Sequence, residues 1–393
     1  MSILLKNCKF IGVLTKDQLS QGDLLIENGI IMDVSNEIDE KEGIEVVDLN
    51  NQFVLPGFID LHVHLTLSGN DVLYDNFKPD YYMTLMAYKF AVDSLKSGFT
   101  TLRDVGSNVA LVNSIRDSIN DGLLKGPRIL SSGMIISPTE NGNEYFAKMY
   151  RECDGKYEFI SGVRQELKAG ADFIKVMASG AIMNPGGEPG SPVLEDEELQ
   201  AIVDTAKLKG KYVAAHAHSA DAIKQCIKCG VRTIEHSSLI DDEAIESLKD
   251  NEQTYIVPTI TAIAGLKASD DASFINEKLQ KFGDEFTKSL KNAYLKNTFM
   301  GFGTDQGVTE TYHGNNADEF IYRKEVLEMK NIDILTQATI NSAIIAQIDD
   351  IVGTIEVGKD ADLVVLDGNP LEDISVCKNN VNQVFKRGVK IND

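Results

Sequence analysis

The middle of the chain alternates between short apolar runs and longer stretches in which apolar residues recur at helical spacing. Six runs have the length and β-branched content of strands: "FTTLRDV", "ADFIKVMAS", "KYVAAHAHS", "VRTIEHSS", "TYIVPT" and "MGFGTD". Between them, "YYMTLMAYKFAVDSLKSG", "EDEELQAIVDTAKLKG" and "DDEAIESLKDN" have the helical period. Repeated strand-then-helix units predict a parallel sheet. Residues 58–351 are long enough for a (β/α)8 TIM barrel, and a doubly wound sheet is the alternative.

Both ends of the chain have a different pattern, made of short β segments. Residues 1–57 contain "SILLKNCKFIGVL", "GDLLIENGIIMDV" and "IEVVDLNNQFVL", and the turn residues Asn28-Gly29 and Asn50-Asn51 between them predict hairpins. Residues 352–393 have the same pattern of short β segments, in "GTIEVGKDADLVVLDGNP" and "VNQVFKRGVKIND". We therefore predict a small β-sandwich domain composed of residues 1–57 and 352–393, attached to a barrel domain over 58–351.

Charge and composition narrow the class of function. The 393 residues carry 38 basic and 60 acidic side chains, a net charge of −22, which disfavours nucleic acid and anionic membranes as partners. No apolar run approaches the roughly 20 residues that span a bilayer, and no secretory signal pattern is present. The five cysteines are sparse and odd in number, which favours the reducing cytoplasm. Cys226 and Cys229 are expected to end a helix closed by Gly230.

The stretch "PGFIDLHVHL" sets polar residues into an apolar strand. Side chains alternate faces along a strand, so Asp60, His62 and His64 share one face. Buried imidazoles need polar partners, and a metal ion is one such partner. Two satisfied core histidines are the alternative interpretation.

The ends of later strands carry further candidates. "AAHAHS" ends with His216 and His218, "TIEHSS" with His236, and "GFGTDQG" with Asp305. Functional groups gather at the carboxyl ends of barrel strands, so these side chains are expected to meet. Asp305 could instead cap a helix.

Two residues inside these strands carry charge. "DFIKVMASG" holds Lys175, which could instead be a surface lysine whose stem lies along apolar residues. Glu235 precedes His236 and is expected to point away from the barrel axis, towards a structural partner among the helices.

The order His-X-His, Lys, His, His, Asp at successive strand ends resembles the amidohydrolase superfamily. The strings that carry the resemblance run from "LPGFIDLHVHL" through "GFTTLRDVG", "FIKVMASG", "AAHAHS", "TIEHSSLIDD" and "GFGTDQG" to "GTIEVGKDADLVVLDGNPLEDI". They are similar to the branch that holds the Xaa-Pro dipeptidase-like and imidazolonepropionase-like amidohydrolases. The resemblance implies a (β/α)8 barrel with a β-sandwich, and two divalent metal ions, with zinc as the expected metal.

The resemblance also implies a role for each candidate residue. His62 and His64 would hold one metal, His216 and His236 the other, and a carboxylated Lys175 would bridge them. Asp305 would bind the first metal and act as general base and acid towards a metal-activated hydroxide. His216 is preferred to His218 as the ligand because it precedes His236 by 20 residues, as in the relatives. His218 and His313 would contact substrate, with Asp60 supporting the ligands from behind.

Two activities follow from the resemblance. The first is hydrolysis of an amide bond in a small substrate, either a dipeptide or an N-acyl amino acid. The second is an imidazolonepropionase-like cyclic-amide hydrolase or a deaminase. Those mononuclear enzymes lack the lysine and carry a glutamate three residues after the strand-five histidine, where this chain has Ser219. The sequence therefore favours the first, while lactone or organophosphate hydrolysis and a non-catalytic scaffold are weaker alternatives.

The chain departs from dipeptidase-like relatives in two loops. Where they carry Gly-Gly-His after strand three, "SPTENGNEYF" has no histidine, and Gly180-Ala181 replaces their Gly-Gly after the lysine strand. A small-molecule substrate is expected, and the sequence is compatible with a homo-oligomer.

Overall fold

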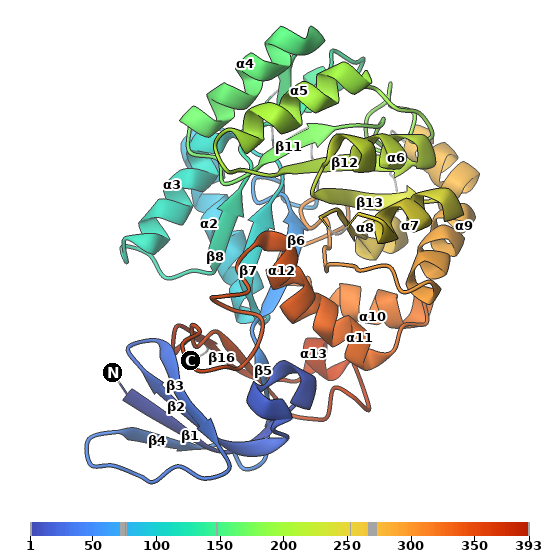
Figure 1. The fold of residues 1–393 in the computed structure, drawn as a ribbon. Helices are drawn as coiled ribbons and strands as arrows, with labels where there is room; N and C mark the ends of the chain where they lie inside the picture. Colours follow the sequence, from blue (N-terminus) through green and yellow to red (C-terminus); the bar gives the residue numbers. More distant parts are fainter. Residues whose placement is uncertain are drawn as a thin grey trace.

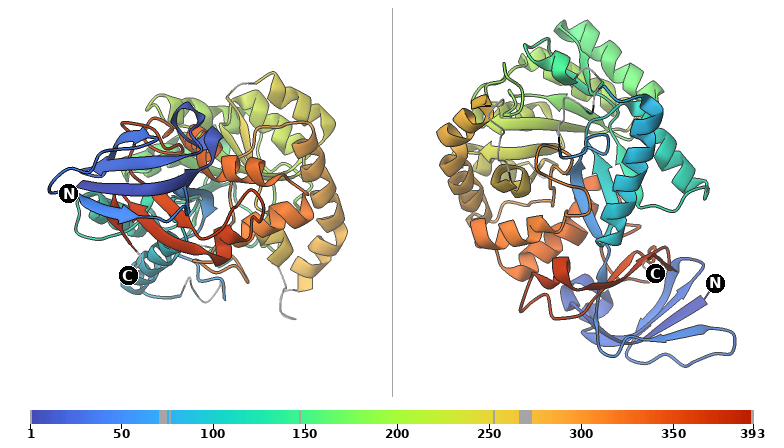
Figure 2. Two further views of the ribbon diagram at one scale, coloured as in Figure 1. Left: turned by 90° about the horizontal axis from the view of Figure 1, so that it is seen from below. Right: turned by 180° about the vertical axis from the view of Figure 1, so that it is seen from behind.

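A computed structural model describes residues 2–70, 75, 77–146, 148–251, 253–265 and 273–391. The molecule has a larger body of parallel strands and helices, and a β-sheet to which both chain ends contribute (Figure 1). The two termini lie close together at this sheet in both further views (Figure 2). No helix within these ranges has the length and apolar character that a membrane crossing requires.

The sheet at the chain ends joins the first residues to the last. Its order is β17-β16-β15-β5-β1-β2-β3, with β4 also paired to β1. Leu5 and Phe10 from the first strand pack with Leu363 and Phe385 from the last ones in a single buried cluster. The strands are β1 Ser2–Phe10, β2 Gln21–Glu27, β3 Ile30–Ser35, β4 Glu45–Asp48, β5 Phe53–Pro56, β15 Leu363–Leu366, β16 Val381–Lys386 and β17 Val389–Lys390.

The two predicted hairpins have different outcomes. Asn28 and Gly29, both at positive φ, turn β2 into the antiparallel β3, which confirms the first. The second is wrong, because β4 and β5 both pair in parallel with β1, one after the other along it. Asn50 and Asn51 also have positive φ, but Asn51 N donates to Asn7 O at 2.9 Å. The turn therefore offsets the chain along β1 without reversing it.

Two parallel sheets form the larger body. One has the order β6-β7-β8 and the other β10-β9-β11-β12-β13-β14. Their strands are β6 Phe58–Val63, β7 Phe99–Asp104, β8 Arg128–Ser131, β9 Ile135–Ser137, β10 Tyr150–Glu152, β11 Ile174–Met177, β12 Val213–Ser219, β13 Thr233–Leu239 and β14 Tyr255–Val257. Parallel strands of this kind are buried on both faces, as the burial of every residue of β6, β7 and β11 shows.

Helices follow most of these strands and cover the outside of the sheets (Figure 1). They are α2 Asp80–Lys96, α3 Val109–Asn120, α4 Gly155–Lys168, α5 Asp196–Lys207, α6 Ala220–Cys229, α7 Asp242–Lys249, α8 Ile260–Gly265, α9 Ser273–Leu295, α10 Asp318–Val326, α11 Asn331–Thr336, α12 Ser342–Ala346 and α13 Val376–Asn379, with a π-helical turn at Gln337–Asn341. As predicted, Cys226 and Cys229 lie in the last turn of α6, which Gly230 ends at a φ of 79°.

Backbone hydrogen bonds join the two parallel sheets at two places. Asp172, before β11, donates to Ser131 O of β8 at 2.8 Å. On the other side, Gly301 N donates to Ile256 O of β14 at 2.9 Å, and Leu61 N of β6 donates to Phe302 O at 2.8 Å. The segment around residues 300–305 therefore lies between β14 and β6.

A buried ion-pair network connects the body to the sheet at the chain ends. Asp362 Oδ2 accepts hydrogen bonds from Arg128 of β8 at 3.0 Å and from Lys386 of β16 at 2.6 Å. Its other oxygen accepts from Arg387 N at 2.9 Å. Burial alone would raise the pKa of Asp362, but the charges of Lys386 and Arg128 hold it below its usual value.

Removing this carboxylate should destabilise the protein. Asp362→Ala leaves the largely buried Lys386 without its ion-pair partner and Arg128 with Asp360 alone, a loss of about 3 kcal/mol in the free energy of unfolding. The control Glu40→Ala breaks the exposed pair with Lys6 and should change the free energy of unfolding far less, because solvent screens that pair. The chain has no tryptophan, so urea unfolding is followed by circular dichroism.

The effect of Asp362 should also depend on pH in a defined direction. A carboxyl group whose folded pKa is depressed stabilises the protein above the ordinary value of about 4, and this is lost as the pH falls through the lower folded pKa. The difference between wild type and Asp362→Ala should therefore shrink below about pH 4. A difference that is constant or grows on acidification would contradict the assignment.

Candidate metal centre

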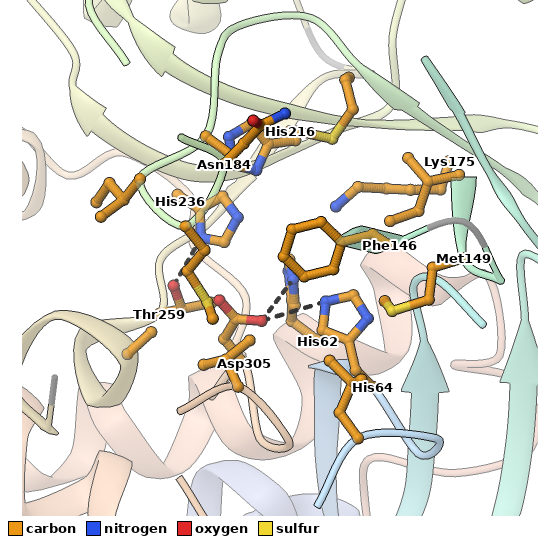
Figure 3. A pocket seen from close by; sticks show the side chains of 18 of the residues that line it. His62, His64, Phe146, Met149, Lys175, Asn184, His216, His236, Thr259 and Asp305 are labelled. Carbon is orange, nitrogen blue, oxygen red and sulfur yellow. Dashed lines mark hydrogen bonds and ion pairs between the residues drawn. The ribbon is translucent and has the colours of Figure 1, made fainter. Parts of the chain in front are cut away.

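Two groups of possible metal ligands lie at the carboxyl ends of the parallel strands. His62, His64 and Asp305 form one group, and the potential ligand atoms within it lie within 4.8 Å of one another. A second group with the same spacing consists of the three histidines of β12 and β13, His216, His218 and His236. All six residues are buried and line one cavity, together with Lys175. Figure 3 labels all of these residues except His218.

The first group has its ring tautomers set by neighbouring acceptors. His64 Nδ1 lies 2.9 Å from Gly106 O, and His62 Nδ1 lies 2.8 Å from Glu235 Oε2. Because a carbonyl and a carboxylate accept only, each Nδ1 carries the hydrogen, and in the neutral ring each Nε2 presents a lone pair. Both Nε2 atoms lie 3.3 Å from Asp305 Oδ1.

Asp305 lacks a hydrogen-bond donor on the oxygen that faces these rings. Its Oδ1 is buried and unpartnered within the described residues, and neutral imidazoles cannot donate from Nε2. Burial raises the pKa of Asp305, but positive charge on His62 and His64, or on a cation bound between them, holds it well below its usual value, so the group is an anion. A buried, unpartnered carboxylate oxygen facing two lone pairs is the environment that a divalent cation satisfies. The residues present therefore fit a metal ion.

Asp305 is placed by its backbone. Its φ of 65° is unusual for a residue with a side chain, and its N–H donates to His62 O at 2.7 Å. The alternative that Asp305 caps a helix is not supported, since no helix of the described chain begins there.

The second group presents free nitrogens in the same way. His236 Nδ1 lies 2.8 Å from Thr259 Oγ1, which leaves Nε2 towards the cavity. His216 Nε2 lies 3.4 Å from Gly180 O, which leaves Nδ1 free. Burial lowers the pKa of both rings well below the usual value, so they are neutral and able to bind a cation.

His218 differs from its neighbours in its surroundings. Its Nδ1 lies 3.1 Å from Ser238 Oγ, and its ring stacks on Phe286 with centroids 5.7 Å apart. Burial lowers its pKa to about 3, so this ring is neutral as well.

Lys175 extends from β11 into the same cavity and is only 2% exposed. It is therefore not a surface lysine. Burial lowers its pKa to about 8, so a sizeable fraction of the amine is uncharged near neutral pH. An uncharged amine is the form that can react with carbon dioxide.

The expectation that Glu235 points towards the helices is wrong. Its side chain is fully buried inside the body, where Oε2 accepts from His62 and Oε1 accepts from Arg103 at 2.7 Å. His236 and Ser237 both have positive φ, which breaks the strict alternation of strand faces and lets Glu235 and His236 both reach the interior. The sequence contains one indication of the inward direction of Glu235. Arg103 lies in the apolar strand "FTTLRDV" and therefore needs a buried carboxylate partner.

Asp60 supports this end of the site through the backbone. It accepts hydrogen bonds from Thr304 Oγ1 at 2.6 Å, Asn316 Nδ2 at 2.7 Å and His62 N at 3.0 Å. Burial raises its pKa to about 6. Asp60 thereby fastens β6 to the segment that carries Asp305.

The structure does not bring His313 into the cavity. Its Nε2 lies 3.2 Å from His64 O and 3.1 Å from Leu67 O, and its ring stacks on Phe90. His313 is absent from the lining of the cavity that the described residues form. Its contacts hold the backbone that follows His64, which differs from the expected contact with substrate.

Comparisons with known proteins show which family the chain belongs to. A model of the amidohydrolase family matches residues 53–391. Ochratoxinase from Aspergillus niger is 28% identical over 398 residues, which cover 92% of this chain and 80% of the relative. Imidazolonepropionase from Picrophilus torridus is 24% identical over 373 residues, covering 88% and 85%. A crystal structure of a Xaa-Pro dipeptidase with methionine bound in its active site superimposes with a TM-score of 0.90 and 34% identity over 99% of both chains.

The family match extends over most of the chain and includes all the strand ends described above. It confirms the resemblance seen in the sequence. The chain therefore belongs to the amidohydrolase family and is a hydrolase that acts on carbon–nitrogen bonds.

Proposed function

We propose that this protein is a binuclear metal-dependent hydrolase that cleaves the amide bond of a small substrate, a dipeptide or an N-acyl amino acid. The observation that carries the proposal is the convergence of two buried ligand groups and Lys175 on one cavity. Zinc is the expected metal, because imidazole nitrogens and a carboxylate oxygen are its usual ligands alongside thiolates.

We also propose that the body is a closed (β/α)8 barrel, with the sheet at the chain ends as the β-sandwich domain of the family. The hydrogen bonds that join the two parallel sheets at two places support closure. On this reading the barrel domain spans 58–351 and the composite domain spans 1–57 with 352–393. The ligand groups then lie at the carboxyl-terminal mouth of the barrel, where such enzymes carry their active sites.

The ligand assignment follows the orientation of each ring. His62, His64 and Asp305 would hold one ion, and His216 and His236 the other, with Lys175 as a carboxylated bridge. When bound, two divalent cations activate a water molecule as nucleophile and polarise the substrate carbonyl. Carboxylation of Lys175 would convert a buried amine into an anionic oxygen ligand, which removes the cost of burying a cation among neutral imidazoles.

Asp305 has the position and charge of a proton carrier. It is an anion whose Oδ1 faces the cavity, so it can accept a proton from an attacking water and deliver it to the leaving nitrogen. His218 is free to contact substrate through Nε2, because Ser238 occupies its other nitrogen.

The similarity to the Xaa-Pro dipeptidase and to ochratoxinase supports an amide substrate. The alternative is an activity like that of imidazolonepropionase, to which the chain is also similar. Lys175 in the cavity and Ser219 in place of a glutamate favour the first. The five cysteines, all unpaired, agree with the proposed cytoplasmic location.

The two histidines of β12 can be separated by metal content. His216→Ala should lower the zinc content of dialysed protein from two ions per chain towards one, because a ligand is lost. His218→Ala should retain two ions and reduce turnover. Elemental analysis and amide hydrolysis measured on the same samples test this, and the opposite pattern would reverse the assignment.

Lys175→Ala should remove the bridge and lower the catalytic rate at least about a hundredfold. Acetate should restore part of the rate and of the metal content by occupying the vacated space. Lys175→Arg is the matched control and should show no rescue, since guanidinium is always charged and cannot bind a cation. Two metal ions and wild-type turnover in Lys175→Ala would refute the carboxylated bridge.

Glu235→Gln should weaken zinc binding about 10- to 100-fold, because the carboxylate that orients His62 is lost. The matched control is Glu319→Gln, which disrupts the equally buried pair with Arg323 at 2.7 Å. Both variants should unfold at lower temperature, but only Glu235→Gln should release zinc to a competing chelator more readily. Equal zinc affinity in the two variants would reduce Glu235 to a structural role.

A further inference from the structure

The cavity has an apolar side next to the ligand groups. The apolar wall consists of Leu67, Ile135, Phe146, Met149, Met177 and Met183, all of which line the cavity and pack in one cluster. Phe146 and Met149 line the same cavity as Lys175 and His62, and all four are labelled in the close view (Figure 3). Three of the six are methionines, whose flexible thioether chains adapt to varied apolar partners.

Lys175 is the one lysine or arginine in the cavity lining that the described residues form. Lys278 of α9 lies near but is engaged with the backbone. Its ammonium donates to Asn184 O at 2.7 Å, to Ala181 O at 3.2 Å and to Gly187 O. Lys278 therefore holds the loop that contributes Met183 to the apolar wall.

The same loop is fixed from its other side. Asn184 Nδ2 donates to Asn143 Oδ1 at 3.2 Å, and Asn184 Oδ1 accepts from Gly186 N at 3.1 Å. A Cβ on Gly142, which has a φ of 101°, would lie 1.9 Å from Asn184 Oδ1. The carboxamide of Asn184 is thus used within the protein, and the two loops that carry Phe146 and Met183 are joined directly.

We infer, on the basis of the amide hydrolysis proposed above, that the apolar wall binds an uncharged, hydrophobic group next to the scissile bond. An aliphatic, thioether or aromatic group there would bury its surface against side chains that are already held in place. A charged group in the same position would lose its hydration without gaining a partner. The preferred substrates are therefore dipeptides or N-acyl amino acids with a hydrophobic side chain or acyl group.

Two substrate series locate this preference. The first keeps an acetyl group and varies the amino acid through alanine, methionine, leucine, phenylalanine, aspartate and lysine. The second keeps one amino acid and varies the acyl group through acetyl, hexanoyl and succinyl. In at least one series, kcat/KM should rise about tenfold or more from the smallest to the hydrophobic members. The kcat/KM values of the charged members of that series should be lower than that of the smallest member. A preference for charged groups, or no preference, in both series would overturn the inference.

A variant in the wall gives an independent test. Met183→Lys places a cation in the loop of the apolar wall and should lower kcat/KM for the preferred hydrophobic substrate at least about tenfold, while raising it for the acidic member of that series. Met32→Lys, at an exposed position of β3, is the matched control and should change neither value. Zinc content and circular dichroism should stay at wild-type levels in both. An unchanged preference in Met183→Lys would overturn the inference.

Direct binding separates this inference from the proposed function. Calorimetry with the same compounds should show tighter binding of hydrophobic members, with a negative heat-capacity change that Met183→Lys reduces. If zinc-loaded protein hydrolyses no compound but this binding pattern is observed, the proposed function is wrong and the inference that the apolar wall binds a hydrophobic group is supported. If amides are hydrolysed without any hydrophobic preference in rate or binding, the inference about the apolar wall is wrong and the proposed function is unaffected.

Discussion

The carboxylate of Glu235 is the contact on which the arrangement of the site depends. It joins three strands, because Glu235 belongs to β13, Arg103 to β7 and His62 to β6. Arg103 also donates to Leu61 O at 2.6 Å, so the guanidinium fixes the backbone next to the same histidine. A buried ion pair is stable only when every donor and acceptor is satisfied, and here each carboxylate oxygen has its own partner. The pair thereby sets both the tautomer and the position of His62.

Asp60 performs the corresponding task at the neighbouring point of the sheet. It bonds to the backbone of His62 and to Thr304, the residue before Asp305. His62 and Asp305 come from segments about 240 residues apart in the chain, so their 3.3 Å approach relies on such cross-connections. Glu235 and Asp60 are both fully buried, and neither lines the cavity. These two anions therefore define where the ligands of the first group lie.

Much of this could be read from the sequence. The spacing of His62 and His64 placed them on one face, and the order of His216, His236 and Asp305 at strand ends predicted their meeting. What failed depended on local backbone geometry. Positive φ at His236 reversed the expected direction of Glu235, and the turn at Asn50-Asn51 continued along β1 without forming a hairpin. Residue type gives only a weak indication of φ. The position of His313 could not be predicted from periodicity either, because it is set by the carbonyl groups of a loop that is distant in the chain.

The apolar wall could not be predicted from the sequence either. Its members come from five separate stretches of chain, several of them loops without periodicity, and only the fold brings them together. Their proximity to the ligand groups links specificity to catalysis, since a substrate held against Phe146 and Met149 lies within the same cavity as Asp305.

The binuclear centre is the central claim, and anomalous X-ray diffraction at the zinc absorption edge tests it most directly. Crystals of zinc-loaded protein grown with bicarbonate should show two anomalous peaks roughly 3.5–4 Å apart, as in other two-metal sites. One peak should lie among His62, His64 and Asp305, and the other between His216 and His236, with density for a carboxylate extending from Lys175 between them. A single peak together with an unmodified lysine side chain would contradict the account.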